Sequence, residues 1–274
     1  MPRLKTDNGL ARGDVATATE DRAITIDVLA NDKGGAAAHL FSVDQDNPAI
    51  AALQGVSALG ATISIVGGKI AYLANGAALD ALSAGELVTD TFTYTMQVGN
   101  GALSQATVTV TVTGVNDAPI VKGAVLGAAT EGGATVSLDA LASASDVDHG
   151  TTLMVVNAPA NLSAGVTYDA ITHRFTLDPT NAAYNHLAAG ATQTVTVRYD
   201  VSDGMVATPG GAVSWTVTGV NDPAVISGSK AGDVTEDAPT KHTASGVLTV
   251  TDPDEGQASF RAPASLAGQY GAFA

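Results

Sequence analysis

The sequence predicts an all-β protein made of tandem Greek-key β-sandwich domains. Three observations support this prediction: stretches that alternate apolar and polar residues, turn-forming residues between them, and a repeat of domain size. The chain has 274 residues, a length that suits about two domains. Aromatic residues make up only 4% of it, so aliphatic residues must fill most of the core. Its 30 glycines favour many short strands joined by turns.

Apolar and polar residues alternate with a period of two in three stretches of the chain. In each stretch one face collects valine, alanine or aromatic side chains, and the other face collects mainly threonine. Such runs are typical of antiparallel strands with one buried face. The three stretches are residues 91–98 (TFTYTMQV), 104–113 (SQATVTVTVT) and 192–201 (TQTVTVRYDV).

The heptapeptide TVTGVND occurs at residues 111–117 and again at residues 216–222, an offset of 105 residues. An identity of this length at a domain-sized offset indicates a duplicated domain. The match continues outward, because Tyr94 and Tyr199 each lie 22 residues before the asparagine of their GVND motif. We therefore expect one sandwich domain at 13–117, a second at 118–222, and a partial third repeat or C-terminal extension at 223–274.

The third segment has only about 52 residues. This is too few for a complete sandwich, since domains of this kind need about 100 residues. Three interpretations stay open for it: a truncated repeat, additional strands on the second domain, or a partly disordered extension.

The chain is strongly acidic, with 27 acidic and 12 basic residues and a formal net charge of −15. Such a chain repels nucleic acid and anionic membrane surfaces. Its carboxylates form either a solvated acidic surface or clusters that await a hard cation such as calcium. The absence of cysteine excludes disulfides and thiolate metal sites.

Export signals of the usual kind are not found in the sequence. Residues 1–12 lack the apolar core of a cleaved signal peptide, and no apolar run approaches the length of a membrane span. These features fit either a cytoplasmic protein or one exported by a route that does not read the N-terminus.

The junction after each repeat carries the clearest chemical pattern. Asn116-Asp117 and Asn221-Asp222 end the last predicted strand of their repeats, shortly before a proline. One interpretation is an ordinary turn whose Asn and Asp cap their own backbone. However, a glutamate near the next strand and a D-x-D pair follow each junction. Because D-x-D brings two carboxylates towards one point and calcium takes six to eight oxygens, the pattern predicts calcium sites.

The GVND and TDPDEG elements and the YDVSDG segment at residues 199–204 resemble the cadherin-like domains of bacteria, including the VCBS and RTX-adhesin repeats. The third segment, from Gly246 onward, is very similar to the opening of a VCBS repeat. The resemblance covers nearly the whole chain and implies calcium ligands at each junction. At the first junction these are Glu20, Asn116, Asp117, Asp146 and Asp148. At the second junction they are Glu131, Asp200, Asp203, Asn221, Asp222, Asp252 and Asp254, with Glu236 as the matching glutamate of the third segment.

The first repeat departs from the family pattern at two places. Tyr94-Thr95 stands where the second repeat has Tyr199-Asp200, so one ligand is lost. After the VLAND segment at residues 28–32, the sequence KGGAAAH replaces the acidic turn that often follows. A further acidic site in this repeat is still an alternative, formed by Asp27, Asn31, Asp32, Asp44 and Asp46.

Nothing in the sequence favours an enzyme. The G-x-S-x-G, P-loop and H-E-x-x-H motifs do not occur. Aspartate-rich turns resemble a glycosidase acid pair only superficially, because they lack apolar and aromatic neighbours. The single tryptophan, Trp215, is in register with Val213 and Val217, so we expect it in the core and not as a sugar platform. The sugar-binding residues stay unknown, with Tyr168, Phe175, Tyr184, Tyr199 and Tyr270 as candidate contacts.

Three functions fit these features: a calcium-dependent polysaccharide-binding protein, a rigid spacer module of a large adhesin, and an accessory domain of an extracellular hydrolase. The chain resembles the Rap (rhizobial adhering) proteins most. This resemblance implies type I secretion, an extracellular or cell-surface location, and calcium-dependent recognition of acidic exopolysaccharide in biofilms by a monomer. Calcium then either contacts the sugar directly or only rigidifies the protein.

Overall fold

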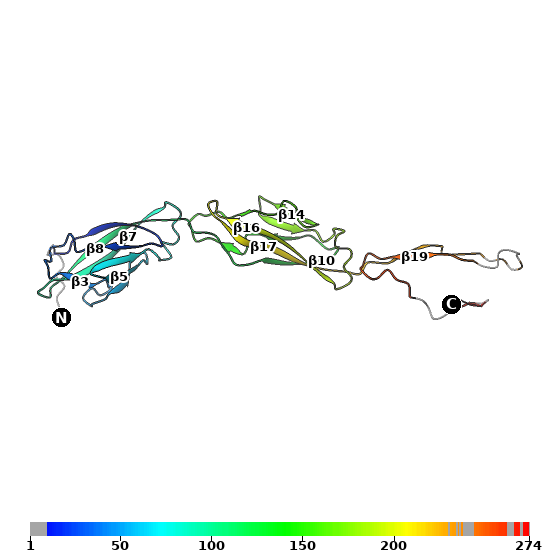
Figure 1. Cartoon of the computed structure of the whole chain (residues 1–274), viewed down its shortest axis with the longest axis horizontal. Helices are drawn as coiled ribbons and strands as arrows, with labels where there is room; N and C mark the ends of the chain where they lie inside the picture. The colour runs from blue at the N-terminus through cyan, green and yellow to red at the C-terminus, as the bar shows by residue number, and fades with distance from the viewer. Residues whose placement is uncertain are drawn as a thin grey trace. The chain divides into compact units, whose positions relative to one another are not determined.

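The computed structural model describes residues 10–229, 231–233, 235, 237, 244–261, 266–268 and 271–273 (Figure 1). In these residues the regular secondary structure consists of β-strands alone. Two compact units contain them. Unit 1 runs up to Ile120 and includes the loops Ser145–Leu153 and Ser202–Ala207, and unit 2 holds Val121–Ala144, Met154–Val201 and the chain from Thr208. The units interleave along the sequence, so the domain boundaries at 117 and 222 stay a prediction.

Unit 1 is a sandwich of two four-stranded sheets. The first sheet has the strand order β1-β8-β7-β3, and the second has the order β2-β6-β5-β4. This arrangement, with hairpin neighbours in each sheet and strands that cross between sheets, is a Greek-key sandwich and confirms the predicted fold class. The strands are β1 (Asp14–Thr19), β2 (Ala23–Ile26), β3 (His39–Ser42), β4 (Gln54–Val56), β5 (Thr62–Val66), β6 (Lys69–Leu73), β7 (Leu87–Gln97) and β8 (Leu103–Thr113).

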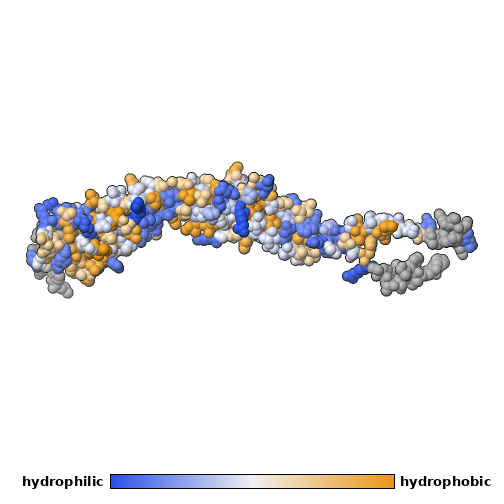
Figure 2. Space-filling view, in the orientation of Figure 1, coloured by the Kyte–Doolittle hydropathy of each residue, from blue (hydrophilic) through white to orange (hydrophobic). Residues whose placement is uncertain are grey.

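The alternating sequence of β7 and β8 explains how unit 1 forms its core. Val108, Val110 and Val112 are fully buried, while the threonines between them face outward. Phe92 lies opposite Val108 in the antiparallel register, and its ring stacks on that of Tyr72 at 5.9 Å between centroids. Polar and apolar residues are mixed over the outer surface (Figure 2), as expected for strands with one solvated face.

Unit 2 repeats this architecture. One sheet has the order β10-β17-β16-β13 and the other β11-β15-β14. In both units the last strand of the repeat pairs in parallel with a strand near its start, β8 with β1 and β17 with β10. The strands are β10 (Val125–Thr130), β11 (Val136–Asp139), β13 (Met154–Val156), β14 (Val166–Asp169), β15 (Arg174–Leu177), β16 (Thr192–Ser202) and β17 (Ala207–Thr218), with β9 (Ile120–Val121) paired to β12 (Ala144–Ser145).

Trp215 lies in the core of unit 2, as its register predicted. Its side chain is fully buried, and its indole Nε1 donates a hydrogen bond to the carbonyl of Val136 at 3.1 Å. Three candidate sugar contacts, Phe175, Tyr184 and Tyr199, are buried as well. Tyr270 lies outside the described residues. The described aromatic side chains therefore serve the core more than the surface.

The third segment forms short hairpins of its own. Strand β18 (Val225–Gly228) pairs with β19 (Leu248–Thr251), and β20 (Leu266–Gly268) pairs with β21 (Gly271–Phe273). In the described residues, these strands do not extend the sheets of the second repeat. A search of the described residues for a helix long and apolar enough to cross a membrane finds none.

Candidate metal centre

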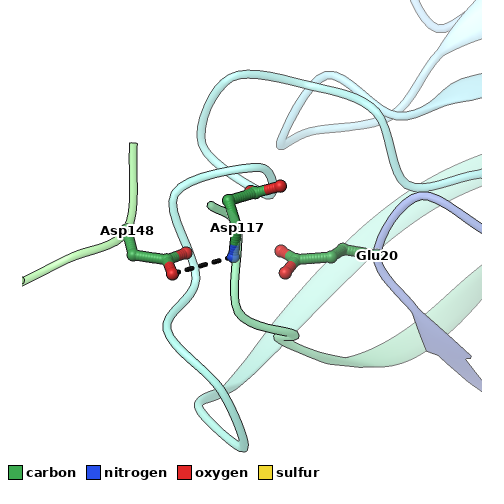
Figure 3. Close-up of side chains that lie close together, drawn as sticks. All are labelled: Glu20, Asp117 and Asp148. Atoms are coloured by element: carbon green, nitrogen blue, oxygen red, sulfur yellow. Dashed lines mark hydrogen bonds between the residues drawn. The ribbon is translucent and has the colours of Figure 1, made fainter. Parts of the chain in front are cut away.

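Three predicted ligands meet in unit 1. Glu20 comes from the turn after β1, Asp117 from the chain after β8, and Asp148 from the loop after β12. One carboxylate oxygen of each lies within 4.8 Å of the others. Glu20 and Asp148 approach Asp117 from opposite sides (Figure 3). We call Glu20, Asp117, Asp148 and the adjacent Asp146 the first cluster.

Backbone N–H groups orient these carboxylates. Val115 N–H donates to Glu20 Oε1, and Asp117 N–H donates to Asp148 Oδ2 at 3.0 Å. Asp148 N–H in turn donates to Asp146 Oδ1 at 2.9 Å. The second oxygen of each acceptor is buried and has no hydrogen-bond partner among the described residues. These oxygens are Glu20 Oε2, Asp146 Oδ2 and Asp148 Oδ1.

A buried carboxylate oxygen without a hydrogen-bond partner destabilises the folded state unless a proton or a cation neutralises its charge. Glu20 is 1% exposed and Asp148 is 7% exposed. Burial raises the pKa of Glu20, and the nearby charges of Asp117 and Asp148 raise it further. Burial also raises the pKa of Asp117, followed by the charge of Asp148. Because the described residues place no basic side chain in an ion pair with the cluster, its oxygens are suited to a hard cation.

Two further carboxylates border the first cluster, and the sequence did not single them out as ligands. Asp21 and Asp80 line a hollow of about 230 Å³ together with Asp117. Asp80 Oδ1 is buried without a partner among the described residues, and burial followed by the charge of Asp21 raises the Asp80 pKa. The T-E-D pattern at 19–21 contains Asp21, but no sequence signal marks Asp80, which lies in the loop before β7.

The GVND motif fits the site through its glycine. Gly114 N–H donates to the carbonyl of Glu86 at 2.8 Å, and a Cβ on Gly114 would lie 2.3 Å from the carbonyl oxygen of Ser83. Gly219 of the second motif makes the matching bond to Ala191, and its Cβ would lie 2.2 Å from the carbonyl oxygen of Leu187. Only glycine lets the chain pass this close to the neighbouring loop.

That neighbouring loop also holds the segment that supplies Asp148. His149 N–H donates to the carbonyl of Ala81 at 2.8 Å, and Ser83 Oγ donates to the carbonyl of His149. His149 Nδ1 lies 3.2 Å from Glu86 Oε2. Hydrogen bonds of the next residue, His149, therefore hold the segment with Asp148 against this loop.

Four carboxylates in unit 2 are held by matching backbone hydrogen bonds, although in the part of the chain that the structure describes only the first cluster brings three carboxylate oxygens within 4.8 Å of one another. Val220 N–H donates to Glu131 Oε2 at 3.0 Å, and Asp222 N–H donates to Asp254 Oδ2 at 3.0 Å. Asp254 N–H donates to Asp252 Oδ1 at 2.9 Å. Asp254 Oδ2 also accepts a hydrogen bond from Gln257 Nε2 at 3.1 Å, which has no counterpart at Asp148. Glu131 Oε1 and Asp254 Oδ1 are buried without partners among the described residues. We call Glu131, Asp222, Asp252 and Asp254 the second cluster.

The third segment thus supplies two members of the second cluster. Glu255 N–H donates to the carbonyl of His186 at 3.0 Å, as His149 does to Ala81 in the first cluster. Asp254 is 2% exposed and Glu131 is 8% exposed. The remaining predicted glutamate, Glu236, lies outside the described residues.

The structure corrects the placement of Asp200 and Asp203, which the sequence assigned to the second junction. Asn116 Nδ2 donates to Asp203 Oδ2 at 2.7 Å, so Asp203 lies beside the first GVND motif. Asp200 accepts a hydrogen bond from Asn157 Nδ2 at 2.8 Å. Both follow from the hairpin of β16 and β17: Asp203 is in its turn, whereas the second motif follows the far end of β17.

The two motif asparagines act on the backbone. Asn116 Nδ2 donates to the carbonyl of Asp117 at 2.6 Å, and Asn221 Nδ2 donates to the carbonyl of Asp222 at 2.8 Å. Each asparagine side chain thereby holds the backbone carbonyl of the aspartate that follows it.

The alternative acidic site of the first repeat does not assemble as one cluster. Asp27 forms an ion pair with Lys69 at 3.0 Å. Asp32 accepts hydrogen bonds from the Tyr94 hydroxyl and from Arg12 N–H. Asn31 donates to Asp14, which lies close enough to Asp32 and Asp27 for their charges to act on it, so these three members gather around Asp14. Asp44 instead accepts from the N–H groups of its neighbours Asp46 and Asn47.

One family model matches part of the chain. Residues 6–111 match the family model described as "Bacterial Ig domain". A search of curated proteins finds no match. Among solved structures, the chain is similar to extracellular cadherin domains 1–5 of protocadherin gamma B2, with 13% identity, a TM-score of 0.43, and coverage of 93% of this chain and 47% of that chain.

Two further structures show similarity of the same level. For extracellular cadherin domains 1–4 of protocadherin gamma B7, the identity is 16% and the TM-score 0.45, with 91% of this chain and 61% of that chain covered. For the human desmocollin-1 ectodomain, the identity is 12% and the TM-score 0.41, with 89% of this chain and 45% of that chain covered. The chain thus spans between 45% and 61% of the length of these three proteins.

Proposed function

We propose that this chain is an extracellular calcium-binding protein that recognises acidic exopolysaccharide in a calcium-dependent manner. The observation that carries the proposal is the pair of clusters in which backbone N–H groups hold one oxygen of each buried carboxylate, while the other oxygen has no hydrogen-bond partner within the described ranges. Bacterial Ig domains, the family matched by residues 6–111, are generally non-catalytic and surface-exposed modules, which agrees with a binding role.

The donor set favours calcium over other metals. The described clusters offer carboxylate oxygens, and the chain has no cysteine for a soft metal. Calcium accepts six to eight oxygens in variable geometry, whereas magnesium demands a small, regular octahedron. In the first cluster, Glu20, Asp117, Asp146 and Asp148 would hold the ion. In the second, Glu131, Asp222, Asp252 and Asp254 would hold it.

Calcium dependence follows from the charge of the protein. A chain of net charge −15 repels an acidic polysaccharide, and bound divalent cations reduce this repulsion. The buried aromatic residues of unit 2 leave the sugar to be bound mainly by polar groups. We propose secretion to the cell surface or biofilm matrix as a monomer, and we propose no enzymatic activity.

The second candidate is a calcium-stabilised spacer of a larger adhesin with no ligand of its own. The observation that favours it is the recurrence of the same hydrogen-bond network in both clusters, as expected for a repeated structural joint. Both candidates predict calcium binding. They differ in whether the calcium-loaded protein binds a saccharide.

The test is binding of acidic exopolysaccharide to immobilised protein, with calcium and after chelation. The double variant Asp148→Asn/Asp254→Asn removes one buried charge from each cluster. The variant Asp169→Asn makes the same charge change at the exposed end of β14 in unit 2 and serves as the control. Calcium-dependent binding that the double variant loses and the control keeps supports the proposal. Calcium uptake without polysaccharide binding favours the spacer.

A further inference from the structure

Unit 1 contains a polar hollow beside the first cluster. It has a volume of about 320 Å³ and lies between β1, β2 and the end of β8. Its lining includes the hydroxyl-bearing residues Thr17, Thr19 and Thr113 and one cation, Arg22. None of the carboxylates of the two clusters lines this hollow, so the proposed calcium sites do not account for it.

Arg22 is not engaged by an acidic partner in the part of the chain that the structure describes. The ion pairs found there join Lys69 to Asp27 and His149 to Glu86. Arg22 is exposed to solvent, although the chain carries 27 acidic residues. A guanidinium in a hydroxyl-lined hollow is a recognisable site for an anion that also carries hydroxyl groups.

One tight turn connects this hollow to the first cluster. Asp21 has a φ of 57°, in the left-handed region, and Arg22 N–H donates to the carbonyl of Thr19 at 3.4 Å. Asp21 N–H is bonded to the carbonyl of Ala74 at 3.1 Å. The turn therefore sets the backbone positions of Glu20, a member of the cluster, and of Arg22, which lines the hollow.

We propose that this hollow binds the carboxylate of an acidic sugar residue, with Arg22 as its cation and the threonine hydroxyls as partners for the ring hydroxyls. This inference rests on the proposed function and names the ligand class and the contact surface. A single guanidinium fork matches one planar carboxylate in a bidentate fashion. A doubly charged phosphate would call for further cations, and the lining of this hollow has only Arg22.

The location explains calcium dependence without contact between metal and sugar. Glu20 and Asp21 precede Arg22 directly, and Thr113 lies two residues before Val115, whose N–H holds Glu20. Neutralisation of the first cluster by calcium would remove negative charge close to the hollow. The anionic sugar then meets a local field dominated by Arg22.

The test uses calcium-loaded full-length protein and isothermal titration with trigalacturonic acid, with the uncharged galactose trimer of the same linkage as the neutral probe. Arg22→Gln should weaken binding of the acidic trimer by roughly tenfold to a hundredfold, the usual effect of losing hydrogen bonds to a charged group. Arg22→Lys keeps the charge but cannot form the two parallel hydrogen bonds of a guanidinium. Its affinity for the acidic trimer should therefore lie between those of the wild type and Arg22→Gln. Arg198→Gln, with the same charge change at an exposed position on β16, should stay within about twofold of wild type.

Two controls separate failure of the site from failure of the function. Arg22→Gln must still bind calcium at least as tightly as the wild type, because the loss of a cation near the first cluster can only favour another cation. Thr17→Val, which keeps the shape of an exposed strand residue, should weaken sugar binding several-fold with calcium uptake unchanged.

Equal binding of the acidic trimer by wild type and Arg22→Gln would overturn the assignment of the hollow and leave the proposed function intact. Equal affinity for the neutral and acidic trimers would also overturn it. Calcium uptake by a wild-type protein that binds neither the trimer nor the polymeric exopolysaccharide would instead refute the proposed function.

Discussion

Asp148 accepts a hydrogen bond from the backbone N–H of Asp117 through Oδ2, while its Oδ1 stays buried without a partner among the described residues. The backbone of one segment thus positions the carboxylate of another, 31 residues further along the chain. Asp254 has the same relationship with Asp222, at a separation of 32 residues. A repeated arrangement that leaves buried anions incompletely bonded is more consistent with ion binding than with stability alone.

Replacement of Asp148 by asparagine tests this relationship. Asparagine Oδ1 still accepts from Asp117 N–H, but one charge is lost, so calcium affinity of the first cluster should fall roughly tenfold or more. Without calcium, the variant should unfold at the same or a higher temperature than wild type, because repulsion among Glu20, Asp117 and Asp148 is reduced. Thermal unfolding with and without calcium measures both effects, and a variant less stable than wild type in chelator contradicts the argument.

The two clusters should differ in affinity. Asp21 and Asp80 border the first cluster, whereas Gly132 and Asn185 occupy the equivalent positions of the second repeat. More carboxylates give tighter calcium binding, so the first cluster should bind more tightly. Asp80→Asn should weaken calcium binding at the first cluster, and Asn185→Asp should tighten calcium binding at the second. Each variant should therefore bring the two affinities closer together. A two-site calcium isotherm checks this, and identical sites in the wild type would refute it.

Gly114→Ala should destabilise unit 1. The added methyl group would lie 2.3 Å from the Ser83 carbonyl oxygen and 2.5 Å from that of Leu82, so the loop that holds the Asp148 segment must shift. Overpacking of this kind costs roughly 1–3 kcal/mol. Denaturant unfolding measures the loss. Gly85, with open space around its Cβ but a φ of 78°, gives the contrasting case of a glycine needed for backbone conformation alone.

Asp14 should make the protein less stable as pH rises. Burial raises its pKa from 3.8 to about 6, with a further contribution from the charge of Asp32. Since the folded state favours the protonated carboxyl, this stabilising contribution is complete below pH 3.8 and is lost as pH rises through about 6. Asp14→Asn should therefore be more stable than wild type at pH 7, by on the order of 1 kcal/mol after solvent screening.

The pH profile of unfolding provides the check on Asp14, with Asp169→Asn as the contrast. Hydrogen bonds from Ile171 N–H and the Thr172 hydroxyl lower the pKa of Asp169, so its stabilising contribution is present above pH 3.8. Asp169→Asn should therefore lower the free energy of unfolding at neutral pH. If Asp14→Asn and Asp169→Asn changed the free energy of unfolding at neutral pH in the same direction, the environments assigned to the two carboxylates would be contradicted.

The fold was accessible from the sequence because its signal is local. Alternation in residues 104–113 and 192–201 directly reports one buried face, and the structure places Val108, Val110, Val197 and Val201 in the cores as expected. The repeated motif marked where each repeat ends. It did not show why Gly114 and Gly219 are needed, because that reason is contact with a loop distant in sequence.

The candidate site was predictable only in part, because some of its contacts join residues that are distant in sequence. Glu20, Asp117 and Asp148 belong to recognisable motifs, whereas Asp80 lies in a loop without one and is brought near by the fold. Asp203 follows the tyrosine of the second repeat in sequence, but the turn of the β16–β17 hairpin places it beside Asn116. Pairwise geometry of this kind depends on strand direction, which spacing along the chain does not encode.

The most direct measurement of the central claim is isothermal titration of calcium into chelator-stripped wild-type protein, with the Asp148→Asn/Asp254→Asn variant and the Asp169→Asn control beside it. We expect saturable uptake at two classes of site in the wild type and in the control, and a large loss of affinity in the double variant. Absence of uptake by the wild type, or equal uptake by the double variant, would contradict the account and reduce both clusters to solvated turns.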